Sequence, residues 1–182
     1  LGIDTEWGSA GADDDSRPPS IVQLAVPGWA WVVDAKATSA DLGALLSWLL
    51  AARCGGGLRL LGFAFKRDAA RLAALLPALP PGDSCSGEEG HAVFRAEEFQ
   101  AGVGDLQQLV MGAEAAGAAW GPGRPPGLRV VTESFLGRTL DKALQRSDWD
   151  ARPLSAEQLR YAAADASVLV DLALALEGGE QK

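Results

Sequence analysis

Three short apolar segments follow one another at the start of the chain, and a long leucine-rich segment separates them from a fourth. The first three, Leu1–Trp7, Ser20–Val26 and Trp29–Asp34, have the length and the β-branched and aromatic content of strands. Pro27-Gly28 is a turn sequence between the second and the third. This order predicts an antiparallel meander at the start of the fold.

The leucine-rich segment connects the meander to the next strand. Leucines at helical spacing predict a helix over Ser39–Arg53, and Gly55–Gly57 ends it. Leu58–Phe65 is an apolar run typical of a buried strand, and a helix over Lys66–Leu76 follows until Pro77 stops it. A strand, helix and strand in this order form a crossover, so we expect an α/β fold.

The second half of the chain is predicted to be mainly helical. Pro77–Gly90 and Gly112–Gly127 are rich in Gly, Ala and Pro and are expected to be loops, and Val93-Phe94 between them predicts a short strand. The remaining periodic segments predict helices over residues 105–110, 128–136, 140–145 and 155–176. Ser155 and Gln158 form a capping box for the last helix.

Length and composition indicate one domain without a membrane span. The chain of 182 residues is long enough for one compact core, so we predict a single domain over residues 1–182. No apolar run is long enough to cross a bilayer. The chain starts within a strand pattern, without Met or a secretory signal, so we expect a domain of a longer protein. Cys54 and Cys85 lack metal-ligand and disulfide spacing, which predicts free thiols in an intracellular compartment: the nucleus, the cytoplasm or an organelle.

Acidic side chains and one tyrosine form the candidate functional residues. Asp4 and Glu6 lie two residues apart in the first strand and share a face, and Tyr161 and Asp165 lie one helical turn apart. Asp68 follows the strand-to-helix junction, the edge where α/β sheets usually form sites. Gathered carboxylates repel one another and lose hydration unless cations neutralise them. Oxygen ligands of this kind predict Mg²⁺ or Mn²⁺.

The net charge of −8 at pH 7 would ordinarily argue against a nucleic-acid partner. Part of this charge belongs to the candidate metal site, where bound cations would reverse the local sign. Basic residues still cluster at 66–67, 138–142 and 146–152. The net charge therefore does not exclude a nucleic-acid substrate.

With these residues in this order, the chain resembles a known family, the 3′-to-5′ exonucleases with four catalytic carboxylates and a tyrosine. This is the ribonuclease D and Werner-type exonuclease group. The resemblance covers nearly the whole chain and rests on Leu1–Trp7, Gly62–Asp68, residues 140–158 and Tyr161–Asp165. With Gln23 in the second strand, the chain is most similar to the Mut/Nibbler-type exonuclease domains that trim small RNAs. The resemblance implies a ribonuclease H-like mixed β-sheet flanked by α-helices.

The resemblance also implies an activity and a role for each residue. The implied enzyme is a metal-dependent 3′-to-5′ exonuclease that releases nucleoside monophosphates from a single-stranded 3′ end, with RNA favoured over DNA. Asp4 would bridge two divalent cations, Glu6 and Asp165 would complete the first, and Asp68 would hold the second through water. Such a cation pair stabilises both the attacking water and the departing 3′ oxygen. Tyr161 would orient that water.

Several side chains near these motifs have a substrate-binding and a structural interpretation. The candidates for substrate contact are Trp7, Phe63, Trp149 and Arg152. For Trp7 the preferred alternative is packing against the last helix, and for Trp149 with Arg152 it is a structural clamp. Lys142 and Arg146 are candidates for phosphate contacts or for a solvated helix face.

Two alternatives to an active exonuclease remain at this point. One is a catalytically degenerate domain kept as a nucleic-acid-binding or scaffold module, which commonly loses carboxylates. The other is an endonuclease of the wider ribonuclease H-like class. All four carboxylates and the tyrosine are present, which favours the exonuclease.

Overall fold

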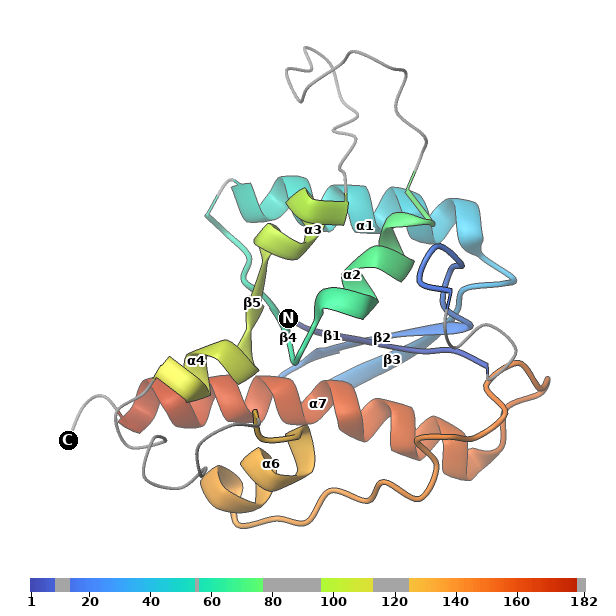
Figure 1. The fold of residues 1–182 in the computed structure, drawn as a ribbon. Coiled ribbons are helices and arrows are strands. Elements are labelled where there is room, and N and C mark those ends of the chain that lie inside the picture. Colours follow the sequence, from blue (N-terminus) through green and yellow to red (C-terminus); the bar gives the residue numbers. More distant parts are fainter. Residues whose placement is uncertain (9–13, 55, 77–95, 113–124, 180–182) are drawn as a thin grey trace.

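The computed structural model describes residues 1–8, 14–54, 56–76, 96–112 and 125–179. These residues form a five-stranded sheet with the strand order β3-β2-β1-β4-β5 and with helices on both faces (Figure 1). The strands are β1 (Gly2–Glu6), β2 (Ile21–Val26), β3 (Trp29–Asp34), β4 (Leu60–Gly62) and β5 (Val103–Asp105). The helices are α1 (Ser39–Cys54), α2 (Lys66–Ala73), α3 (Ala96–Gly102), α4 (Leu106–Gly112), α6 (Leu128–Leu136) and α7 (Ala156–Gly179).

The sheet is mixed, as the sequence predicts. Strands β1, β2 and β3 are antiparallel, and the register places Asp4 opposite Gln23. Strand β4 is parallel to β1 and pairs with it only at Gly2, while β5 is parallel to β4. The register thus brings Asp4 and Gln23 onto one face, because directly opposed residues of an antiparallel pair point the same way.

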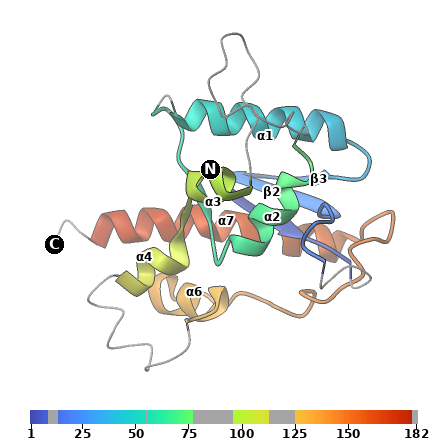
Figure 2. The same ribbon diagram turned by 45° about the horizontal axis from the view of Figure 1, so that its top comes forward.

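The two faces of the sheet have different cores. On one face, Ile3, Val22 and Leu24 belong to the same buried cluster as Leu46 of α1 and Leu72 of α2. On the other face, small residues pack against α7, among them Ala25 of β2 and Ala166. Figures 1 and 2 show α1 and α2 on one side of the sheet and α7, backed by α6, on the other. The predicted carboxylates of β1 lie on the α7 side.

A close approach between α7 and β1 brings the two ends of the chain together. A Cβ at Gly2 would lie 2.5 Å from the backbone oxygen of Ala166. Only glycine fits at this distance, and the neighbouring Ala162 and Ala166 are also small and fully buried. The close packing sets the helical turn that carries Tyr161 and Asp165 against the strand that carries Asp4.

The strand at Leu58–Phe65 is shorter than the sequence predicts. β4 ends at Gly62, and Ala64 has φ 52°, a left-handed conformation that a strand does not allow. The carboxylate of Asp105, at the end of β5, accepts hydrogen bonds from the backbone N–H groups of Ala64 and Phe65 at 3.0 and 3.1 Å. These bonds hold the sharp turn that leads into α2.

Two further expectations differ from the structure. Residues 140–145, predicted to be a helix, have an irregular and turn conformation, because Leu140 and Leu144 pack into two apolar clusters along α7. Strand β5 was not expected from the sequence, because its three residues Val103–Asp105 are too short to show a pattern. Val93-Phe94, Pro77–Gly90 and most of Gly112–Gly127 lie outside the described residues.

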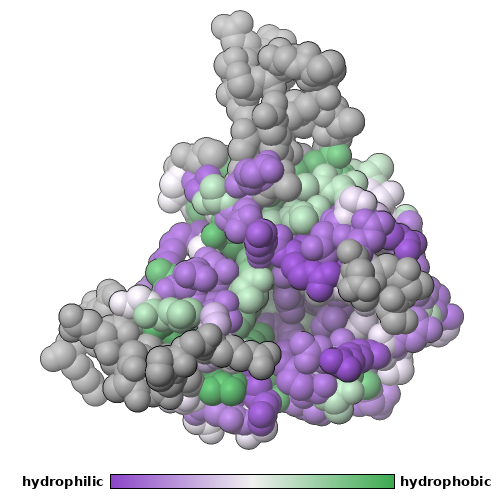
Figure 3. Space-filling model, in the orientation of Figure 1, coloured by the Kyte–Doolittle hydropathy of each residue, from purple (hydrophilic) through white to green (hydrophobic). Residues whose placement is uncertain are grey.

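The surface contains both polar and apolar regions. Figure 3 shows hydrophilic side chains gathered between α2 and α7. Trp29 of the edge strand β3 is 72% exposed. In the described part of the chain, no helix combines the length and the apolar character that a membrane span requires.

Candidate active site

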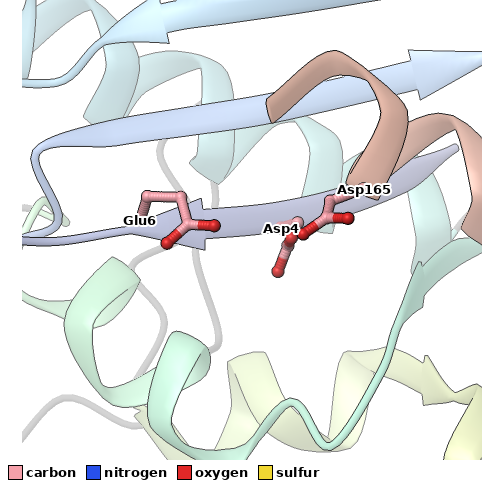
Figure 4. A group of neighbouring side chains, drawn as sticks. All are labelled: Asp4, Glu6 and Asp165. Carbon is pink, nitrogen blue, oxygen red and sulfur yellow. The ribbon is translucent and has the colours of Figure 1, made fainter. Parts of the chain in front are cut away.

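Three of the predicted carboxylates converge from two elements. Asp4 and Glu6 project from β1 and Asp165 from α7, and Figure 4 shows the three side chains turned toward a common space. One oxygen of each lies within 4.8 Å of one oxygen of the others. Asp165 is buried, while Asp4 and Glu6 are half-buried. Residues 161 positions apart thus form one acidic cluster.

The cluster is electrostatically unfavourable as it stands. Burial raises the pKa of Asp4 well above its ordinary value, and the charges of Asp68 and Asp165 raise it further. Burial, followed by the charge of Asp4, raises the pKa of Glu6 to about 9. The pKa of Asp165 is also raised by burial, although Lys142 opposes this shift. A site of this kind favours a divalent cation, which would compensate the negative charge.

Asp68 approaches the cluster from α2, on the opposite side of β1. It is not a member of the group of three oxygens, and its Oδ1 accepts a hydrogen bond from the Thr5 hydroxyl. Burial raises the pKa of Asp68 to about 6, while the bond from Thr5 opposes this shift. Because Thr5 lies between Asp4 and Glu6 in β1, this bond places Asp68 at the edge of the cluster.

Tyr161 lies one turn before Asp165 on α7 and is buried. Its ring packs against Trp149 with 5.7 Å between ring centroids. Burial, followed by the charges of Asp165 and Glu6, raises the pKa of Tyr161 above its ordinary range. Within the described residues, neither the Tyr161 hydroxyl nor Asp165 Oδ1 makes a hydrogen bond of regular geometry, although the two side chains lie close enough to shift each other's pKa. Two buried oxygens thus remain available for a bound cation or water.

Lys142 lies beside the cluster. Its Nζ donates to Oδ2 of Asp165 at 2.8 Å and lies 5.5 Å from the centroid of the Tyr161 ring. The Lys142 side chain is only 24% exposed, so its interpretation as part of a solvated helix face is wrong. Arg146, by contrast, is exposed.

Trp7 and Phe63 remain accessible near the site. The Trp7 ring is half-buried, and the guanidinium carbons of Arg71 and Arg67 lie 4.3 and 5.5 Å from its centroid. These ring contacts come from α2, whereas packing on the last helix was expected. Phe63 is half-buried and packs against the cluster that contains Leu61.

Trp149 and Arg152 form the structural clamp that was the alternative to substrate binding. Trp149 is 0% exposed, so its expected contact with substrate is corrected to a packing role against Tyr161 and Ile21. The Arg152 guanidinium donates to both oxygens of Asp34 and to the backbone oxygen of Ser20. Through these hydrogen bonds, the Arg152 side chain joins the segment before α7 to the sheet.

The donor set fits a divalent cation. The cluster supplies carboxylate oxygens, one of which is buried without a partner in the described structure. Mg²⁺ and Mn²⁺ prefer ligands of this type. The sequence patterns do not point to Thr5, and they indicate Lys142 only as a candidate for phosphate contacts, not as a partner of Asp165. Gln23 was noted only as a family feature, and the structure buries its amide opposite Asp4.

The comparisons with known proteins agree with this geometry. A family model described as 3′-5′ exonuclease matches residues 98–178, which include Tyr161 and Asp165. The chain thus contains a domain homologous to 3′-5′ exonucleases.

Its relatives include two kinds of exonuclease. The Homo sapiens exonuclease mut-7 homolog is 30% identical over 188 residues, which cover 97% of this chain and 20% of that protein. Ribonuclease D of Escherichia coli is 37% identical over 76 residues, 42% of this chain and 20% of that protein. The chain spans about a fifth of the length of these curated relatives.

Solved structures confirm the ribonuclease H-like fold. The Aedes aegypti Nibbler EXO domain has a TM-score of 0.71 at 24% identity, covering 98% of this chain and 78% of that one. Escherichia coli RNase D has a TM-score of 0.59 at 23% identity, covering 98% of this chain and 40% of that one.

The raised pKa values predict how stability depends on pH without divalent cations. A carboxyl whose pKa is raised by folding stabilises the protein while protonated, and this stability is lost as the pH rises through the folded pKa. For Glu6 this window runs from its ordinary value of 4.5 to about 9. In EDTA the melting temperature should therefore fall across this window, and Mg²⁺ should restore it most at high pH. A Glu6→Gln variant should show a weaker pH dependence, and a melting temperature that rises through the window would contradict the charge assignment.

Replacement of the buried Trp149 is expected to have a large effect on the free energy of unfolding. Trp149→Ala should lower the free energy of unfolding by about 3–5 kcal/mol, because it leaves a cavity in a fully buried position. Trp29→Ala is the matched control, since an exposed tryptophan should cost less than about 0.5 kcal/mol. Urea denaturation measures both variants. Equal losses would show that Trp149 does not have the packing role described above.

Proposed function

We propose that this chain is an active, metal-dependent 3′-to-5′ exonuclease domain that acts on a single-stranded 3′ end and releases nucleoside monophosphates. The convergence of Asp4, Glu6 and Asp165 within 4.8 Å supports this proposal most strongly. The chain keeps all the residues that such chemistry needs, which argues against a degenerate binding module. In this proposal, residues 1–182 form a single exonuclease domain.

Each residue has a distinct role in the proposed reaction. When bound, a pair of Mg²⁺ or Mn²⁺ ions would lower the pKa of the attacking water and stabilise the charge on the departing 3′ oxygen. Asp4, Glu6 and Asp165 would hold one ion, and Asp4 with Asp68 would hold the other. Tyr161 would orient the attacking water through its hydroxyl. Its raised pKa keeps it protonated, so it would not act as the base.

RNA is the favoured substrate class. Trypanosoma brucei RNase D, solved in complex with RNA U12, has a TM-score of 0.60 at 25% identity and covers 97% of this chain and 54% of that one. The relatives named ribonuclease D and mut-7 match this chain in sequence. Trp7 and Phe63, which remain partly exposed, are the proposed contacts for the terminal bases, since bases stack on aromatic rings.

The proposed activity can be tested with a labelled oligonucleotide. Single-stranded RNA labelled at its 5′ end should shorten stepwise in Mg²⁺ when its 3′ hydroxyl is free, and should remain intact in EDTA. The same RNA with a blocked 3′ end should resist, and matched DNA should be degraded more slowly. Equal cleavage of the blocked RNA would indicate an endonuclease. Intact RNA with either Mg²⁺ or Mn²⁺ would indicate a degenerate module.

A further inference from the structure

Lys142 is held in a fixed place by the segment that carries it. Leu140 is buried in the cluster formed with α4, α6 and the end of α7, and Leu144, four residues later, packs in the cluster of Trp149 and Tyr161. Lys142 stands between these two apolar anchors. Its ammonium is therefore directed at the middle of α7, and its position does not depend on the ion pair alone.

The two oxygens of the Asp165 carboxylate differ in their contacts. Oδ2 accepts the hydrogen bond from Lys142 Nζ at 2.8 Å. Oδ1 is buried and has no hydrogen-bond partner in the described part of the chain. A buried carboxylate oxygen without a partner is costly, so this geometry leaves one oxygen of Asp165 ready for a cation.

Lys142 also contacts the second functional residue of α7. Its Nζ lies 5.5 Å from the centroid of the Tyr161 ring, one turn before Asp165. The ammonium thus lies beside both functional side chains of this helical turn, Tyr161 and Asp165.

We propose that Lys142 is a positioning residue of the metal centre: its ammonium fixes Oδ2 of Asp165 and leaves Oδ1 for the cation shared with Asp4 and Glu6. This inference rests on the proposed metal-dependent function. Groups that hydrogen-bond to a ligating carboxylate usually contribute a factor of about 10 to 100 in metal affinity. The opposite arrangement, in which the ammonium competes for the site of the cation, would predict tighter metal binding once Lys142 is removed.

The test is calorimetric titration of the whole domain with Mn²⁺, which needs no substrate. Lys142→Met should weaken Mn²⁺ binding by about 10- to 100-fold, because Asp165 loses both its donor and its neighbouring charge. Lys142→Gln, which keeps a donor without charge, should fall between Met and wild type. Lys142→Arg should largely restore the affinity.

Arg138→Met is the matched control. Arg138 joins the same segment to the same helix through Asp171, which follows Asp165 on α7, and both side chains of this ion pair are exposed. The control should leave Mn²⁺ affinity unchanged. Melting curves in EDTA check that each variant is folded before it is titrated, and the Arg and Gln variants keep the test decisive if the Met variant is unstable.

The outcomes separate the two proposals. Wild-type affinity, or tighter binding, in Lys142→Met would overturn the positioning role while leaving the metal centre intact. An equal loss in Arg138→Met would also overturn it, because the effect would then belong to the segment as a whole. Wild-type protein that binds no Mn²⁺ would overturn the proposed metal site itself and the role of Lys142 with it.

Discussion

Replacement of Asp4 by Asn is expected to reduce exonuclease turnover by at least about a thousandfold. In the proposed mechanism Asp4 would contact both cations, and metal stabilisation of a transition state is worth several kcal/mol, at about 1.4 kcal/mol per tenfold in rate. Asn has almost the same volume, so the geometry of β1 should be kept. Rates of release of nucleoside monophosphates from labelled RNA, in Mg²⁺ and in Mn²⁺, measure the loss.

The same variant gives an internal check on folding. Burial and neighbouring charges raise the pKa of Asp4, which shows that its ionised form is unfavourable in the cation-free protein. Asp4→Asn should therefore melt at a higher temperature than wild type in EDTA at neutral pH. Asp41→Asn, an exposed aspartate in the first turn of α1, is the control and should change neither property. Near-normal turnover in Asp4→Asn would remove the basis for a metal centre at this position.

Replacement of Tyr161 by Phe is expected to lower kcat by about a hundredfold, at the lower end of what a positioned proton-transfer or orienting group contributes. The substitution removes one hydroxyl and keeps the ring that packs against Trp149. KM and Mn²⁺ affinity should change little, because the hydroxyl is assigned to the water and not to the cation. Single-turnover rates on RNA would isolate the chemical step.

The pH profile distinguishes orientation from base catalysis. Because the pKa of Tyr161 is raised, the shape of the profile for Tyr161→Phe should match that of wild type between neutral and mildly alkaline pH. Tyr161 is the only tyrosine in the chain, so its ionisation can be followed by phenolate absorbance. Phenolate formation near neutral pH, together with a profile that loses its alkaline limb in the variant, would make Tyr161 a base.

The acidic cluster could be predicted from the sequence because its parts are local and periodic. The two-residue spacing of Asp4 and Glu6 and the four-residue spacing of Tyr161 and Asp165 each define one face. Once Asp4 and Glu6 are placed in a strand, and Tyr161 and Asp165 in a helix, the side chains of each pair point to the same side. The resemblance to known exonucleases then related the two pairs to each other.

The rest of the site depends on contacts between distant segments. Asp68 accepts a hydrogen bond from Thr5 across 63 positions, and Lys142 contacts Asp165 because Leu140 and Leu144 pack into apolar clusters on either side of it. Helical spacing at 140–145 predicted the wrong conformation, since packing along α7 overrides local preference there. Similarly, Trp149 and Arg152 carry groups suited to substrate binding, and only their burial and their bonds showed the clamp.

The cation-binding exonuclease centre proposed for Asp4, Glu6, Asp68 and Asp165 can be tested by anomalous scattering from Mn²⁺, measured in crystals of the domain grown with a nucleoside 5′-monophosphate product. We expect one peak among Asp4, Glu6 and Asp165 and a second beside Asp4 on the side of Asp68, about 4 Å from the first. Mn²⁺ peaks only elsewhere on the protein, with none at this cluster, would contradict this proposal.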